Sequence, residues 1–120
     1  MLPQHLRLKR SQDFYAVRQQ GRRWRGKLIS LSVLPTGLPH SRFGFVVSRS
    51  VGAAVVRNRV KRRLRAAIRT LLPQLTEGYD VVTIAHPPAA EASFQELNET
   101  LDGMFRQAGL FTGNHLAAST

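Results

Sequence analysis

The segment Val55–Arg65, VVRNRVKRRLR, constrains the fold more than any other part of this chain. It carries six basic residues among eleven and no acidic one. At 3.6 residues per turn, its apolar residues share one stripe that continues beyond the segment. We therefore predict a helix from about Ala53 to Leu72, ended by Pro73, that is buried on this stripe. The stripe consists of Val56, Val60, Leu64, Ala67 and Leu71.

The opposite stripe of this helix is polar and almost entirely cationic. Its members are Asn58, Arg62, Arg65 and Arg69, and the flanks hold Arg57, Arg59, Lys61 and Arg63. Stacked like charges on a helix repel by a few tenths of a kcal/mol per pair, and no Glu is interleaved to offset this. A solvated amphipathic helix is the plain alternative, but the pattern favours a face that binds a polyanion. Asn58 fits either a local helix-start hydrogen bond or a contact with a base edge, a 2′-hydroxyl or a metal-bound water.

Charge is segregated along the whole chain, which has a net charge of +11. Residues 1–76 hold seventeen Lys and Arg against a single acid, Asp13, whereas residues 77–120 hold one basic residue, Arg106, against six acids. A single-sign field over most of a small domain indicates a polyanionic partner, most commonly nucleic acid. An anionic membrane surface is the weaker interpretation, because no segment pairs a basic face with a free bulky aromatic face.

The length of 120 residues and the 42% hydrophobic content predict one folded domain, residues 1–120, with a modest core. The absence of cysteine excludes disulfides and thiolate metal sites. No apolar run approaches the length of a membrane span, and the N-terminus has no apolar block typical of a signal peptide. We therefore expect a cytoplasmic protein that makes no contact with membranes.

Local patterns predict the remaining elements. We expect a helix over 11–20, with Ser11 as its N-cap and Gly21 at its C-cap. Two alternating strands, 28–34 and 42–48, are expected to pair as a hairpin, and a third strand follows over 80–85. A capping box, Ser93 with Glu96, opens a last amphipathic helix with apolar positions at Phe94, Leu97, Leu101, Met104 and Ala108. Residues 22–27 read as a strand or a loop, and residues 1–8 and 109–120 as loose ends. The order predicts an α+β sandwich of helices packed on a small sheet.

One stretch carries a resemblance to a known family. Residues 44–65, GFVVSRSVGAAVVRNRVKRRLR, resemble the signature of the bacterial ribonuclease P protein component, in which a G-hydrophobic-VS strand end and a V-G-x-A-V turn precede an R-N-R helix. The resemblance extends over roughly residues 5–110. It implies an α+β fold of the ribosomal protein S5 domain 2 type, with a small mixed sheet, three helices in the order α-β-β-(β)-α-β-α, and a left-handed βαβ crossover.

The resemblance also implies a function. Proteins of this family bind a large catalytic RNA, expected here in a 1:1 complex, and the holoenzyme removes the 5′ leader of precursor tRNA by Mg²⁺-dependent hydrolysis. The RNA subunit holds the active site and most of the Mg²⁺, so no catalytic residue is expected in the protein, which alone should be inactive. No metal ligand is assigned on the protein, and a metal-bound water is one of the alternative contacts named above for Asn58.

Two sets of site residues follow from this resemblance. The expected RNA-binding set is Arg49, Arg57, Asn58, Arg59, Lys61, Arg62, Arg65 and Arg69. The expected cleft for the single-stranded leader is lined by Phe14, Arg18, Leu31, Phe45 and Val47. Arg18 and Leu31 stand where many members have aromatic residues, and Phe14 has the alternative role of a core residue.

Three other functions compete with this interpretation. A nuclease that needs no RNA subunit requires clustered carboxylates or a His pair, whereas the basic region has no acid and His5, His40, His86 and His115 are scattered along the sequence. A general RNA-binding module is equally compatible with the composition. Only the R-N-R motif and the strand and turn that precede it argue against this alternative. A helix-turn-helix DNA reader is disfavoured by the strands that precede the basic helix.

Overall fold

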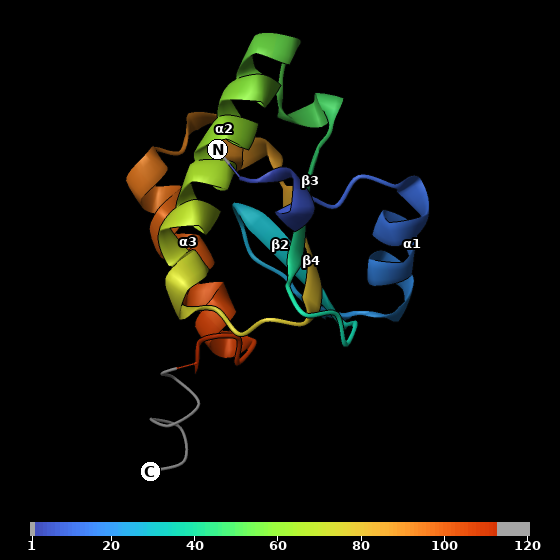
Figure 1. The fold of residues 1–120 in the computed structure, drawn as a ribbon. Helices are drawn as coiled ribbons and strands as arrows, with labels where there is room; N and C mark the ends of the chain where they lie inside the picture. Colours follow the sequence, from blue (N-terminus) through green and yellow to red (C-terminus); the bar gives the residue numbers. More distant parts are fainter. Residues whose placement is uncertain (1, 113–120) are drawn as a thin grey trace.

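The protein is built in three layers, with a four-stranded sheet between one helix and a pair of helices (Figure 1). The computed structural model describes residues 2–112. Helix α1 covers one face of the sheet, and α2 and α3 cover the other. The elements are α1 (Ser11–Gln20), β1 (Arg22–Trp24), β2 (Ile29–Pro35), β3 (Arg42–Val47), α2 (Ala54–Leu71), β4 (Tyr79–Ala85) and α3 (Phe94–Gln107), with short 3₁₀ turns η1 (Gln4–Leu6), η2 (Arg49–Val51), η3 (Leu72–Gln74) and η4 (Pro87–Glu91).

This order confirms the predicted succession of elements. The segment after Gly21, which was predicted as a strand or a loop, contains the short strand β1. The predicted hairpin is wrong. The strand order is β1-β2-β4-β3, so β4 lies between β2 and β3, antiparallel to the first and parallel to the second. Strand β4 is apolar on both faces, and a strand with that pattern is most stable in the centre of a sheet with both faces covered. Strands β3 and β4 with α2 between them form the βαβ unit.

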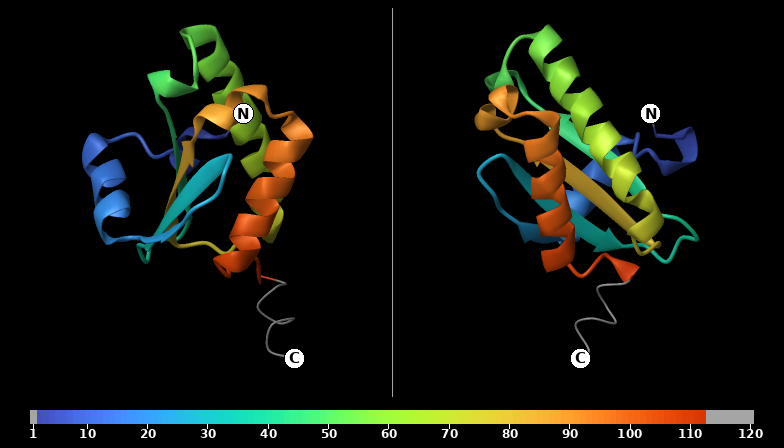
Figure 2. Two further views of the ribbon diagram at one scale, coloured as in Figure 1. Left: turned by 180° about the vertical axis from the view of Figure 1, so that it is seen from behind. Right: turned by 90° about the vertical axis from the view of Figure 1, so that its left-hand side faces the viewer.

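The larger core lies between the sheet and helices α2 and α3, which run side by side (Figure 2). The predicted stripe of α2 faces this core, and Ile68 is buried with it. The capping box of α3 forms as predicted: the Ser93 hydroxyl accepts from the Glu96 N–H, and the Glu96 carboxylate accepts from the Ser93 N–H. Phe94, placed on the buried stripe of this helix from sequence, is instead 40% exposed.

The smaller core lies under α1. Val17 packs with Leu8 and Val82, and Phe14 and Val46 border this cluster. Ser11 is the first residue of the helix and not its N-cap as predicted; Arg10 precedes the helix and makes no side-chain cap hydrogen bond.

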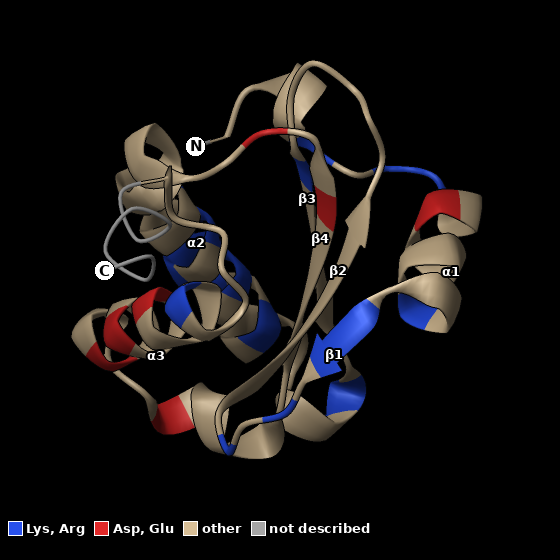
Figure 3. Ribbon diagram, turned by 90° about the horizontal axis from the view of Figure 1, so that it is seen from below, with Lys and Arg blue, Asp and Glu red and all other residues tan. Residues whose placement is uncertain are grey.

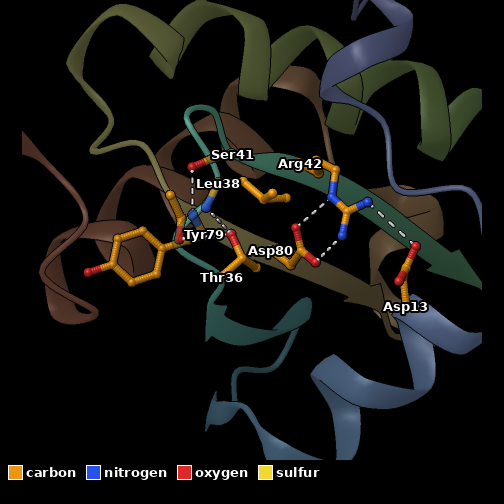
Figure 4. A network of polar contacts seen from close by, with 8 residues as sticks. Asp13, Thr36, Leu38, Ser41, Arg42, Tyr79 and Asp80 are labelled. Atoms are coloured by element: carbon orange, nitrogen blue, oxygen red, sulfur yellow. Dashed lines mark hydrogen bonds and ion pairs between the residues drawn. The ribbon is translucent and has the colours of Figure 1, made fainter.

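A partly buried network of ion pairs joins α1 to the sheet (Figure 4). Arg42 of β3 donates two hydrogen bonds to the carboxylate of Asp80 of β4, at 2.9 Å from Nε to Oδ1 and 2.6 Å from Nη2 to Oδ2. Its Nη1 lies 3.5 Å from Oδ2 of Asp13 in α1. The hydrogen bonding to Asp80 raises the pKa of Arg42, more than burial lowers it, and the Asp80 and Asp13 charges add to the increase. The guanidinium therefore stays charged and holds three elements together.

The chain ends are more ordered than expected where the structure describes them. Leu2 and Leu8 are buried, and so are Leu110 and Phe111, because both segments pack against the cores. These four residues therefore anchor the described parts of both ends, whereas residues 1 and 113–120 lie outside the described part. No helix among residues 2–112 is long and apolar enough to cross a membrane.

Candidate nucleic-acid interface

The outer face of α2 presents the polar stripe to solvent, as the helical periodicity predicted. Asn58, Arg62 and Arg69 are exposed, and Arg65 is half-buried. Figure 3 shows Lys and Arg gathered on α2, which has no acidic residue, whereas the neighbouring helix α3 carries Glu96, Glu99 and Asp102. Arg49 extends the exposed basic surface at the turn η2, just before the helix begins.

The flanking arginines of α2 are anchored by the protein itself. Arg57 Nε donates to the Gly52 carbonyl at 3.1 Å, and Arg63 Nη1 donates to the Ala92 carbonyl at 2.6 Å. The Arg65 guanidinium carbon lies 5.9 Å from the centre of the Phe45 ring. Arg59 Nε is buried and has no hydrogen-bond partner in the described part of the chain. The guanidinium groups of Arg57, Arg63 and Arg65 are therefore held against the protein, whereas Arg62 and Arg69 of the outer stripe remain accessible to a ligand.

Within residues 2–112, no carboxylate forms an ion pair with the basic face of α2. The ion pairs there join Arg42 to Asp13 and Asp80, and Arg106 to Asp102. An exposed row of cations without such pairs binds phosphates well, because each contact also releases counterions from the nucleic acid.

A groove lies between α1 and the side chains of β1 and β3 on the same face of the sheet. It encloses about 460 Å³, and the ring of Tyr15, which is 67% exposed, stands at its side. Two predicted cleft residues, Phe14 and Arg18, lie in it. Aromatic rings with a basic rim suit the sequence-tolerant stacking of single-stranded bases. The lining residues are Lys9, Ser11, Phe14, Tyr15, Arg18, Gln19, Arg23 and Val46.

Two other predicted cleft residues do not lie in the groove. Leu31 and Val47 point to the opposite face of the sheet and are buried under α2 and α3, at 0% and 7% exposure. Alternation groups Leu31 with Ile29 and Val33 on β2, and Val47 with Phe43 and Phe45 on β3, but it does not show which helices cover that side. The residue that does face the groove from β3 is Val46. It lies on the same side of β3 as Gly44, against which the Phe14 ring packs.

A smaller hollow of about 100 Å³ connects the groove to α2. Phe14 borders both spaces, and Lys61 and Arg65 enter the smaller one from the helix. Phe45, the last predicted cleft residue, lies here beside Arg65 and not in the α1 groove. The two predicted residue sets therefore meet at Phe14.

The histidines are less scattered than the sequence indicated. The rings of His5 and His40 are in edge contact, with centroids 5.3 Å apart, whereas His86 Nε2 lies 2.7 Å from the Ser30 hydroxyl. His115 lies outside the described residues. Within residues 2–112, no three His, Cys, Asp or Glu side chains come together in a group able to hold a metal ion.

Sequence comparison places the chain among ribonuclease P proteins. The sequence model of the family described as "Ribonuclease P" matches residues 2–109. The chain is 48% identical over 105 residues to the ribonuclease P protein component of Chloroflexus aurantiacus, covering 87% of this chain and 78% of the relative. It is 42% identical over 116 residues to that of Synechocystis, covering 95% and 94%.

Solved structures share the fold. The ribonuclease P protein of Staphylococcus aureus matches with a TM-score of 0.82 at 24% identity, covering 89% of this chain and 98% of that one. The protein from Thermotoga maritima matches with a TM-score of 0.75 at 26% identity, covering 82% and 93%. These matches confirm the α+β fold that the resemblance implied. The chain therefore belongs to the ribonuclease P protein family, the protein components of the endoribonuclease that processes the 5′ leader of tRNA.

Proposed function

We propose that this single domain binds the catalytic RNA of ribonuclease P through the outer face of α2 and holds the leader of precursor tRNA in the α1 groove. The complex has one protein for each RNA and works in the cytoplasm. The observation that carries the proposal is the position of Phe14, which borders both surfaces: the hollow beside the basic helix, whose side chains form no ion pair within residues 2–112, and the groove with aromatic and basic walls.

The RNA-binding set divides into two roles. Arg49, Asn58, Arg62 and Arg69 are exposed and free to reach phosphates or 2′-hydroxyls of the catalytic RNA. Arg57, Arg59, Lys61 and Arg65 lie partly buried along the flanks, where Lys61 and Arg65 also face the hollow next to the groove. The leader set becomes Phe14, Tyr15, Arg18, Arg23 and Val46, with Phe45 reached from the side of α2.

Phosphodiester hydrolysis in this complex depends on Mg²⁺ held mainly by the RNA subunit. The described residues offer no cluster of metal-binding side chains, so the protein contributes at most an outer-sphere contact, with Asn58 reaching a metal-bound water. The protein supplies positive charge that favours both the folded RNA and the bound substrate. The chain alone is expected to be inactive.

A precursor-tRNA cleavage assay at low Mg²⁺ tests this function. It compares the protein alone, a bacterial ribonuclease P RNA alone, and the two together. We expect only the mixture to cut efficiently, at the junction of leader and mature tRNA, because the cationic protein replaces part of the charge screening that the RNA alone requires. Cleavage by the mixture that is no faster than cleavage by the RNA alone contradicts the proposal.

A further inference from the structure

A third hollow lies at the N-terminal end of α1, outside both surfaces described above. It encloses about 300 Å³ and contains the His5–His40 pair. The side chains come from η1, from the segment between η1 and α1, from α1 itself, and from the β2–β3 loop with the start of β3. The lining residues are Gln4, His5, Arg7, Lys9, Arg10, Asp13, His40 and Arg42.

Most charged side chains in this hollow are cationic and form no ion pair within residues 2–112. Its one carboxylate, Asp13, is engaged by Arg42, which also binds Asp80 behind it. Arg7 is held in place by its Nε, which donates to the Leu2 carbonyl at 2.9 Å. Lys9 and Arg10 are exposed and make no ion pair within residues 2–112. Two imidazoles add N–H donors, so the hollow offers several donors and surplus positive charge to an anion.

The hollow adjoins the two spaces described above through shared lining residues. Lys9 lines both this hollow and the α1 groove, and Arg7 lines both this hollow and the one beside α2. A strand that lies along α1 and leaves the groove past Lys9 is therefore close to the residues of this hollow. His5 and Arg10 are both exposed, so their side chains are accessible to such a strand.

We propose that the single-stranded RNA held in the α1 groove continues over the His5–His40 hollow, which binds its phosphodiester backbone. This inference rests on the proposed function, since it extends the same bound strand. The backbone and not the bases is the ligand, because the hollow has cations and N–H donors but no exposed Phe, Tyr or Trp ring. The hollow then serves leader nucleotides beyond those that the groove accommodates.

A leader-length series tests the inference. The affinity of the reconstituted holoenzyme is measured for precursor tRNAs with leaders of about four to sixteen nucleotides, the range of site sizes of small single-strand-binding domains. The variant carries His5→Gln, Arg10→Gln and His40→Gln, residues that line only this hollow. The control is Arg25→Gln, an exposed arginine in the β1–β2 connection that lines none of the three hollows.

We expect the triple variant to bind short-leader substrates like the wild type and to lose about tenfold in affinity for long leaders, a loss typical of charge-assisted hydrogen bonds. An equal loss at every leader length, or no loss at any, overturns the inference. Failure of the proposed function looks different, because the wild-type protein then gives no gain in binding or cleavage with any leader. Circular-dichroism melting curves of the three proteins confirm that each variant is folded before binding is compared.

Discussion

At the scale of single residues, the junction between α1 and the sheet depends on a glycine. Gly21 follows α1 directly, and its N–H donates to the Val17 carbonyl at 2.9 Å. A Cβ at this position lies 2.4 Å from the Val17 oxygen and 2.7 Å from the Val33 oxygen. Both atoms belong to the backbone, so they cannot move aside as a flexible side chain does. Gly21 is therefore required by close approach, since its φ of −75° suits any residue.

We expect Gly21→Ala to lower the free energy of unfolding by about 2–3 kcal/mol, the cost of forcing an extra carbon into a packed site. Gly103→Ala is the matched control, because it lies within α3 and a Cβ there meets no atom within 4 Å. That change is expected to stabilise the protein by about 0.5–1 kcal/mol through helix propensity. Urea unfolding of both variants measures the difference, and equal stabilities contradict the crowding at Gly21.

At the scale of elements, the two sides of α2 have different roles. Its buried stripe secures the fold, and its outer stripe carries the charge. Arg62 and Arg69 belong to the outer stripe alone, because both are exposed and their side chains form no hydrogen bond or ion pair within residues 2–112. Arg65 does not, because its guanidinium packs over Phe45. A clean test of the RNA face therefore removes Arg62 and Arg69 and leaves Arg65.

We expect Arg62→Ala with Arg69→Ala to weaken binding of the ribonuclease P RNA while leaving the melting temperature unchanged. Each lost phosphate contact is expected to reduce the salt slope of binding by about 1. Arg25→Ala with Lys27→Ala removes the same charge from the exposed β1–β2 connection and serves as the control. Filter binding and thermal melting give the two readouts. A lowered melting temperature means that the outer stripe supports the fold, contrary to its exposure.

At the scale of the whole molecule, the charge is arranged across the layers. The basic residues lie mainly on α2 and on the segments around α1 and β1, while four of the seven acids lie in η4 and α3 (Figure 3). The net charge of +11 is therefore distributed unevenly over the protein. This asymmetry orients the protein on a polyanion and speeds their association.

We expect binding to the cognate RNA to weaken steeply with salt, with a log–log slope of at least about −4, because several phosphates are neutralised at once. Titration of the wild-type protein at four or more salt concentrations measures the slope. A nearly flat response excludes the outer face of α2 as a row of phosphate contacts, whatever the affinity at low salt.

The sequence alone predicted the elements, because local patterns reflect local physics. The two faces of α2 follow from 3.6-residue periodicity, and the α3 capping box follows from Ser93 and Glu96. The position of the basic face and its need for a polyanionic partner follow equally from the sequence, since no neighbouring acid offsets the charge. Two of the five expected cleft residues, Phe14 and Arg18, were placed in the groove.

Only the tertiary structure decided which segments meet. Strand β4 separates β2 from β3, a long-range pairing that alternation within each strand does not encode. Alternation places Leu31 and Val47 on the larger apolar side of their strands, but it does not show that α2 and α3 cover this side while Val46 faces α1. The contact between His5 and His40 joins residues 35 positions apart, and it exists only because η1 packs beside the start of β3. Periodicity reports burial, whereas the partner that covers each face is set by packing between distant segments.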